Sequence, residues 1–123
     1  MLSIQFFVVG VTDMGRAVDF WTRALGYVVS EGGAEADWTE LVPASGPGAA
    51  LALQYSQVPA QEHPRIHLDL AAADAAEQAA EAERLVSLGA SRVDWDLYPA
   101  DPDFVVLADP DGNRFCIVDM SHG

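Results

Sequence analysis

The same order of secondary-structure elements is predicted twice along the chain. Two segments with helical patterns, 14–25 and 75–88, are each followed directly by a glycine, Gly26 and Gly89. Glycine commonly ends a helix because it adopts the left-handed conformation without strain. A strand is predicted before each helix and three strands after it, since short apolar or alternating runs between turn residues are typical of β-structure. These strands are 4–11, 27–30, 38–42 and 49–55 in the first half and 65–70, 91–96, 104–108 and 114–120 in the second.

This repeated order predicts the fold class. One helix can cover only one face of its own sheet, so the other faces can curl together around a cleft lined by alternate strand residues. We therefore expect an α+β fold in which two tandem βαβββ modules form a concave sheet around a cleft, with the helices outside. The expected organisation is a single domain over 1–123, with a first module at about 1–56, a linker at 57–64 and a second module at about 65–120.

Charge and cysteine content narrow the classes of partner and location. The net charge of −13, from 6 basic and 19 acidic residues, repels nucleic acid and anionic membrane surfaces, so neither partner is expected. No apolar run approaches the roughly 20 residues of a membrane span, and the N-terminus lacks the basic region of a signal peptide. One cysteine cannot form an internal disulfide. A cytoplasmic location is therefore expected.

A dense turn motif near the C-terminus completes a set of motifs typical of one superfamily. The sequence Asp-Pro-Asp-Gly-Asn at 109–113 predicts a tight hairpin, because proline presets φ and Gly112 permits a positive φ. With the other motifs, this hairpin makes the chain resemble the vicinal oxygen chelate superfamily of glyoxalases, bleomycin resistance proteins and dioxygenases, and most of all its glyoxalase-like branch. Those motifs are Val11-Thr12-Asp13, Asp19-Phe20-Trp21, Leu25-Gly26-Tyr27, His67-Leu68-Asp69-Leu70 and Asn113-Arg114-Phe115-Cys116.

The resemblance implies four metal-ligand positions, which fall at Phe6, Ala52, His67 and Cys116. Metal-dependent members of the superfamily carry His, Gln or Glu there, and here only His67 keeps such a residue type. A catalytic divalent ion normally has about three protein ligands, so no resident metal is expected. Zinc held by His67 and the Cys116 thiolate, with help from Asp69, is the alternative that the residues leave open.

Alternation along the strands predicts which side chains line the cleft, because residues two apart share a face of a sheet. An apolar cavity with a few convergent polar groups is the usual composition of a small-molecule site. Two inward arginines would each need an acceptor, supplied either by Asp69 or by an acidic ligand. The predicted pocket residues are Phe6, Val8, Trp38, Ala52, Gln54, Arg65, His67, Asp69, Arg114, Cys116 and Val118.

Three functions fit this pocket. The first is a glyoxalase- or bleomycin-resistance-like protein that binds a small aromatic or partly apolar molecule, with the metal site of the superfamily lost. The second is a metal-independent lyase or isomerase, in which His67 and Asp69 share a proton and act as a general base. The third is a non-catalytic dimeric scaffold. The resemblance also implies a homodimer.

Overall fold

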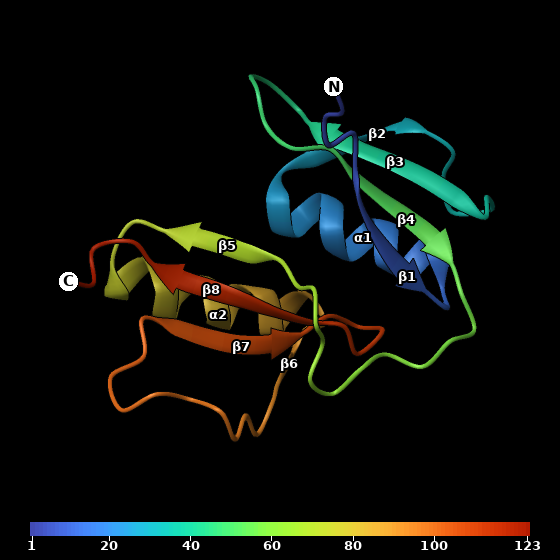
Figure 1. Cartoon of the computed structure of the whole chain (residues 1–123). Coiled ribbons are helices and arrows are strands. Elements are labelled where there is room, and N and C mark those ends of the chain that lie inside the picture. Colours follow the sequence, from blue (N-terminus) through green and yellow to red (C-terminus); the bar gives the residue numbers. More distant parts are fainter. The chain divides into compact units, whose positions relative to one another are not determined.

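The structure, a computed structural model, describes residues 1–123. The chain divides into two compact units, Met1–Pro59 and Ala60–Gly123. Each unit has the element order βαβββ, so the predicted α+β class and its two modules are confirmed (Figure 1). The first unit contains β1 (Phe7–Val11), α1 (Met14–Leu25), β2 (Tyr27–Glu31), β3 (Trp38–Pro43) and β4 (Leu51–Tyr55). The second contains β5 (Asp69–Ala72), α2 (Ala75–Leu88), β6 (Ser91–Arg92), β7 (Phe104–Ala108) and β8 (Arg114–Asp119).

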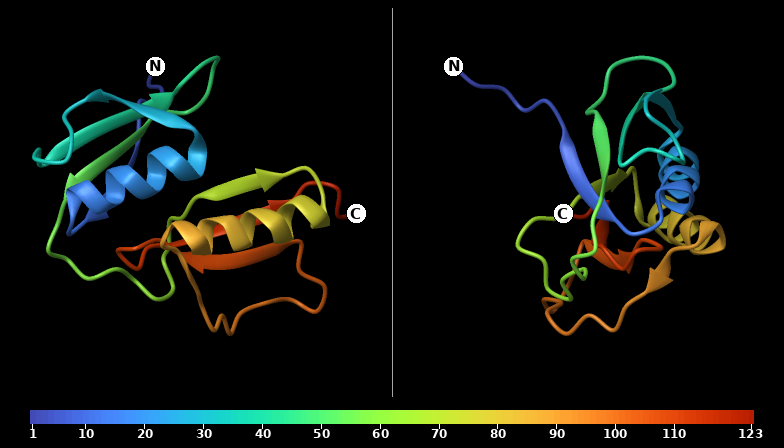
Figure 2. Two further views of the ribbon diagram at one scale, coloured as in Figure 1. Left: turned by 180° about the vertical axis from the view of Figure 1, so that it is seen from behind. Right: turned by 90° about the vertical axis from the view of Figure 1, so that its right-hand side faces the viewer.

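Both units have the same sheet topology. The strand orders are β1-β4-β3-β2 and β5-β8-β7-β6. In each sheet the first and last strands of the module pair in parallel, β1 with β4 and β5 with β8, and the other pairs are antiparallel. Each helix lies along one side of its own sheet (Figure 2). No helix has the length and apolar character needed to cross a membrane.

Both predicted helices have the bounds expected from their sequence. The Asp13 side chain accepts a hydrogen bond from the Arg16 amide at the start of α1, and Gly26 ends that helix at φ 69°. Phe20 and Trp21 are each 1% exposed, and their rings meet edge to face at 5.0 Å. These rings and the fully buried leucines of β3 and β4 form the core of the first unit.

A glutamine on α2 connects this helix to its sheet. The Gln78 side-chain nitrogen donates to the Ile117 carbonyl at 2.9 Å and to the Asp103 carbonyl at 3.0 Å. Gln78 therefore fixes how α2 lies over β8, the strand that carries three of the pocket residues described below. Leu85, which is 2% exposed, supplies the main apolar contact of this helix.

Strand bounds differ from the prediction mainly at the sheet edges. The strand predicted at 65–70 begins only at Asp69, because the residues before it do not pair with a neighbouring strand. The one backbone contact just before β5 is the Leu68 carbonyl, which accepts a hydrogen bond from the Cys116 amide at 2.9 Å. The strand predicted at 91–96 is reduced to Ser91–Arg92, an edge strand whose pairing covers only Ala108 and Leu107 of β7. The strand predicted at 4–11 begins at Phe7.

The role of Gln78 can be tested by substitution. We expect Gln78→Ala to lower the free energy of unfolding by about 1–2 kcal/mol, because two sheet carbonyls lose a hydrogen-bond donor. Glu81→Ala, which removes a partly exposed ion pair with Arg84 on the same helix but no contact to the sheet, is the control, with an expected change within about 0.5 kcal/mol. Urea unfolding of both variants checks this. Equal effects of the two substitutions would show that Gln78 does not hold the helix to the sheet.

Candidate ligand pocket

A pocket of about 360 Å³ opens on the second unit. Its floor comes from β5, β7 and β8, and a wall comes from the loop between β6 and β7. The lining residues are Pro64, His67, Asp69, Trp95, Leu97, Asp103, Phe104, Val106, Arg114, Cys116 and Val118.

Strand register explains which side chains form the floor. Cys116 on β8 lies beside Asp69 of β5 and beside Val106 of β7. Directly paired residues point to the same side of a sheet, so these three side chains share the pocket face. Phe104 and Val118 form the next pair on that face. The floor is therefore apolar along β7 and the later part of β8, and its polar groups gather near the start of β5.

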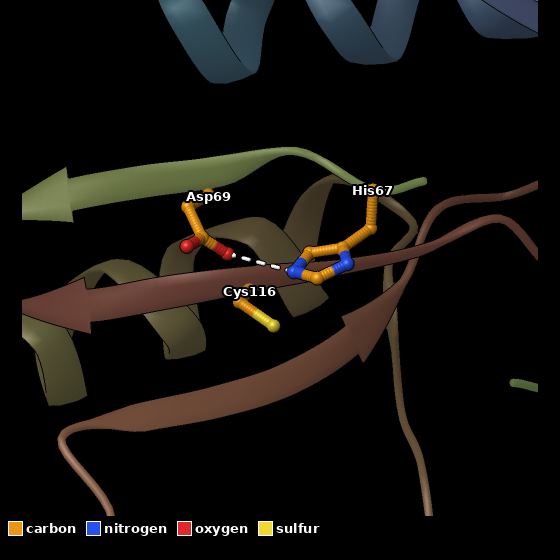
Figure 3. A group of neighbouring side chains, drawn as sticks. All are labelled: His67, Asp69 and Cys116. Carbon is orange, nitrogen blue, oxygen red and sulfur yellow. Dashed lines mark hydrogen bonds and ion pairs between the residues drawn. The ribbon is translucent and has the colours of Figure 1, made fainter. Parts of the chain in front are cut away.

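Three of these polar groups lie close together, at His67, Asp69 and Cys116 (Figure 3). His67 Nε2 donates to Asp69 Oδ1 at 3.0 Å, and both side chains are partly exposed. Cys116 is only 6% exposed. Burial raises the pKa of the Cys116 thiol to about 12, and the negative charge of Asp69 and hydrogen bonding to its carboxylate add to the rise. The thiol is therefore protonated at neutral pH and is a poor nucleophile.

The donor atoms do not match the four-ligand metal site of the superfamily. The ligating atoms of His67, Asp69 and Cys116 lie within 4.8 Å of one another. Phe6 and Ala52, at the other two positions, have no donor atom. An ion held by the first three would have to displace the hydrogen bond between His67 and Asp69 and the proton of the buried Cys116 thiol.

Arg114 is placed in the pocket by the turn before β8. The buried Asp109 carboxylate accepts from the amides of Asp111 and Asn113 at 3.0 and 2.8 Å, which fixes the turn. Gly112 adopts φ 89° there, and its carbonyl accepts from Arg114 Nη1 at 2.8 Å. Arg114 Nε is buried and has no acceptor. The alternative in which Asp69 neutralises this arginine is not observed: the Asp69 carboxylate bonds His67, and it makes no hydrogen bond or ion pair with Arg114.

The wall loop, residues 93–103, is held at both ends by aspartates that pair with histidines. His63 Nε2 lies 2.7 Å from Asp96 Oδ1, and this hydrogen bond holds the pKa of Asp96 below its usual range. The His63 ring also packs on Trp95, with centroids 5.0 Å apart. At the other end His122 Nε2 lies 3.1 Å from Asp101 Oδ2. These contacts give the pocket an aromatic wall with a defined position.

The predicted site residues fall into two groups. Five line this pocket and come from the second unit, but Arg65 is exposed and outside the lining. The five are His67, Asp69, Arg114, Cys116 and Val118. The remaining predictions lie in the first unit and share one side of its sheet or its edge: Phe6, Val8, Trp38, Ala52 and Gln54. A cleft shared by both groups stays a prediction.

Prediction from sequence did not include Val106, Phe104 or Leu97 among the pocket residues. The sequence contained enough information to predict Val106 and Phe104. Pairing the predicted hairpin symmetrically about the turn at 109–113 places Val106 beside Cys116 and Phe104 beside Val118, as observed. Leu97 belongs to the wall loop, and no pairing pattern in the sequence predicts the path of that loop. In the first unit Glu40 was also missed, a half-buried carboxylate beside Ala52 that accepts from Trp38 Nε1 at 2.9 Å.

Several solved protein structures have the same fold as this chain. Protein ATC0852 from Agrobacterium tumefaciens has a TM-score of 0.74 at 17% identity, covering 97% of this chain and 98% of that one. A mutant of the fosfomycin resistance protein FosX from Listeria monocytogenes has a TM-score of 0.73 at 13% identity, covering 96% and 90%. A glyoxalase-related enzyme from Fulvimarina pelagi has a TM-score of 0.70 at 20% identity, covering 96% and 88%.

Sequence comparison agrees with these structures. No curated protein matches the chain. The family model of the glyoxalase-like domain, however, matches residues 6–118, which include both modules and every predicted site residue. The chain therefore belongs to the glyoxalase-like domain family of the vicinal oxygen chelate superfamily.

Proposed function

We propose that the pocket of the second unit binds a small, partly apolar organic molecule without the help of a resident divalent metal. The observation that carries this proposal is the pocket itself, with an apolar floor, a cluster of polar groups at one end and the Asp103 carboxylate at the other. Its volume of about 360 Å³ lies within the range of small-molecule sites. Apolar burial would supply affinity, and the polar end would fix the orientation of the ligand.

Aromatic ligands fit this lining best. Trp95 and Phe104 both line the pocket. Trp95 is backed by the His63 ring, and Phe104 by the Tyr98 ring at 5.3 Å. Planar molecules gain from stacking or edge contacts with such rings, and rings already held in place lose little entropy on binding.

The set of donor residues supports metal independence. The fosfomycin resistance protein from Listeria monocytogenes was solved with Mn(II) and a dihydroxypropylphosphonic acid, so the same fold accepts a small organic molecule. In this chain two of the four ligand positions are Phe6 and Ala52. Ligand recognition then depends on side chains alone.

A metal-independent lyase or isomerase is the second candidate. The hydrogen bond of 3.0 Å between His67 and Asp69 favours it, because a carboxylate can orient an imidazole and stabilise its protonated form. His67 lines the pocket and would accept a proton from a bound substrate as a general base. Turnover that His67→Ala abolishes, while ligand binding persists, would establish this activity.

Binding can be tested with a panel of aromatic compounds by thermal shift. A ligand at 100 times its dissociation constant should stabilise the protein by about 2.7 kcal/mol. We expect Trp95→Ala to weaken binding of hits about five- to tenfold, because a stacking surface is lost. Tyr55→Ala, an exposed aromatic residue of the first unit, is the control and should have no effect. If no compound stabilises the protein, or Trp95→Ala changes no affinity, a scaffold role becomes the better explanation.

Metal content is a separate test. We expect dialysed protein to contain far less than one zinc, nickel or manganese per chain, because the donor set is incomplete. Elemental analysis measures this, with Cys116→Ala and His67→Ala as comparison variants. One zinc per chain in the wild type that is lost in both variants would contradict metal independence and establish the His67–Cys116 site.

The protonation state of Cys116 predicts its reactivity. At pH 7–9 the thiol should alkylate slowly with iodoacetamide, and the rate should rise about tenfold per pH unit because the pKa of about 12 lies above this range. Asp69→Asn removes a negative charge that raises this pKa, so the variant should react faster. Asp103→Asn, which changes another pocket carboxylate, is the control. Identical rates for Asp69→Asn and wild type would show that Asp69 does not control the thiol.

A further inference from the structure

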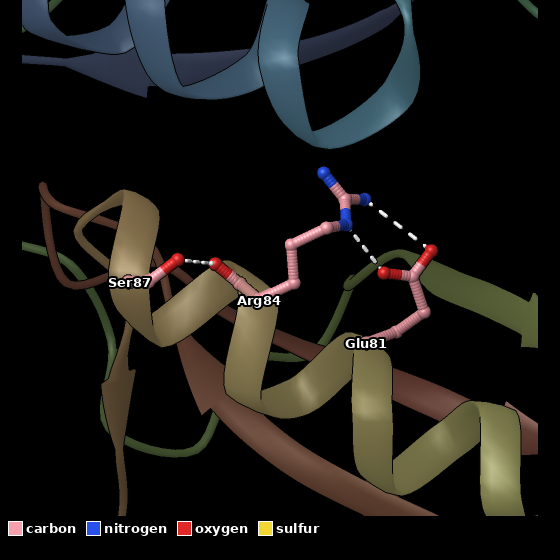
Figure 4. A network of polar contacts seen from close by, with 3 residues as sticks. All are labelled: Glu81, Arg84 and Ser87. Carbon is pink, nitrogen blue, oxygen red and sulfur yellow. Dashed lines mark hydrogen bonds and ion pairs between the residues drawn. The ribbon is translucent and has the colours of Figure 1, made fainter.

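Arg114 differs from the other arginines that have defined contacts. All six basic residues of this strongly acidic chain are arginines. On the surface, Arg84 folds back along α2 and pairs with the Glu81 carboxylate (Figure 4). Arg23 and Arg92 likewise pair with carboxylates, those of Asp19 and Glu83. Arg114 is more enclosed than these three, and yet no carboxylate lies within ion-pair distance of it.

One edge of the Arg114 guanidinium is left without a partner. Nη1 donates to the Gly112 carbonyl at 2.8 Å, and this contact holds the group in place. Nε is buried and has no acceptor, and Nη2 makes no hydrogen bond. The edge formed by Nε and Nη2 is the one that takes a carboxylate side-on with two parallel hydrogen bonds. A group that is enclosed, fixed and unneutralised is prepared for an acceptor from outside the chain.

Arg114 lies at the same end of the pocket as the other clustered polar groups. Asp69 pairs in register with Cys116, so the residues two positions earlier, His67 and Arg114, lie at the same end of this strand pair. His67 uses Nε2 to bond Asp69 and has no partner at Nδ1. A ligand group at this end of the pocket therefore meets both the guanidinium and the imidazole.

The Arg114 end of the pocket also contains the Asp69 carboxylate, which bonds His67, whereas the opposite end contains a carboxylate and no basic group. Asp103 lies next to Phe104 in the sequence, and Phe104 pairs with Val118 of β8. Val118 is four residues further along β8 than Arg114. Four residues of a strand span roughly 13 Å. The acidic group of a ligand is thus attracted to the Arg114 end and repelled from the Asp103 end, with the apolar floor of Val106 and Cys116 between them.

We propose that Arg114 makes the pocket selective for planar apolar molecules that carry a carboxylate or a phenolate at one end. This inference rests on the proposed binding function and names the class of ligand. Neutral analogues of the same shape should bind more weakly, because they lose the charge-assisted pair with the guanidinium. Cationic analogues should bind most weakly at this end of the pocket.

The test compares three probes of one shape: 1-naphthaleneacetate, 1-naphthaleneacetamide and 2-(1-naphthyl)ethylammonium. Dissociation constants are measured by NMR titration of the ¹⁵N-labelled full chain. We expect the acetate to bind about tenfold or more tightly than the acetamide, and this ratio to fall close to one in Arg114→Gln. Arg65→Gln removes the same charge at an exposed position outside the pocket, and it should keep the wild-type ratio.

The wild-type protein offers a readout that does not depend on the folding of a variant. Binding of the acetate should shift the Arg114 Nε–Hε resonance, and the acetamide should shift it much less. A ratio close to one in wild type, a ratio that survives in Arg114→Gln, or an unmoved Arg114 resonance would each overturn the inference. If the acetamide binds with the same affinity as the acetate, the proposed binding function stands and the proposed selectivity for acidic ligands fails. If neither probe binds, both fail together.

Discussion

The register of the β7–β8 hairpin determines which side chains reach the pocket. The buried Asp109 carboxylate and the positive φ of Gly112 fix the turn, and the strands then pair Val106 with Cys116. Side chains alternate along a strand, so a slip of one residue would turn Phe115 toward the pocket and Cys116 toward the helix. The same turn presents the Gly112 carbonyl that holds Arg114. One local hydrogen-bond network thus sets both the apolar floor and the cationic end.

How well the sequence predicts this molecule depends on whether the relevant chemistry is local. Both helices and the hairpin were predicted within a residue or two, because capping residues, terminal glycines and turn residues act on their own neighbours. The start of β5 and the end of β6 were wrong, because strand ends depend on distant partners. That error also explains Arg65: the backbone bonding to β8 extends back only to Leu68, next to His67, and Arg65 lies beyond it, where alternation no longer assigns a face. The wall loop was beyond prediction, since histidine contacts far apart in sequence hold it.

Asp69 connects two chemical properties of the pocket. Its carboxylate accepts from His67, and its charge helps to keep the Cys116 thiol protonated. The same carboxylate makes no ion pair with Arg114. The polar end therefore contains one internally satisfied group of three side chains beside one arginine that lacks a carboxylate, although the chain as a whole has 19 acidic residues. Net charge says little about such a site, because local geometry decides which charges meet.

The two modules show how one architecture can carry chemistry in only one of its copies. In each sheet the first and last strands pair in parallel, with Val8 beside Ala52 in one and Asp69 beside Cys116 in the other. The residue two positions earlier is Phe6 in the first module and His67 in the second. Equivalent positions thus hold three apolar side chains in one copy and a histidine, an aspartate and a cysteine in the other. Donor atoms at these positions are therefore confined to the second copy. This asymmetry between the repeats agrees with the proposed binding of an organic molecule with one polar end, because such a molecule needs polar groups from a single half only.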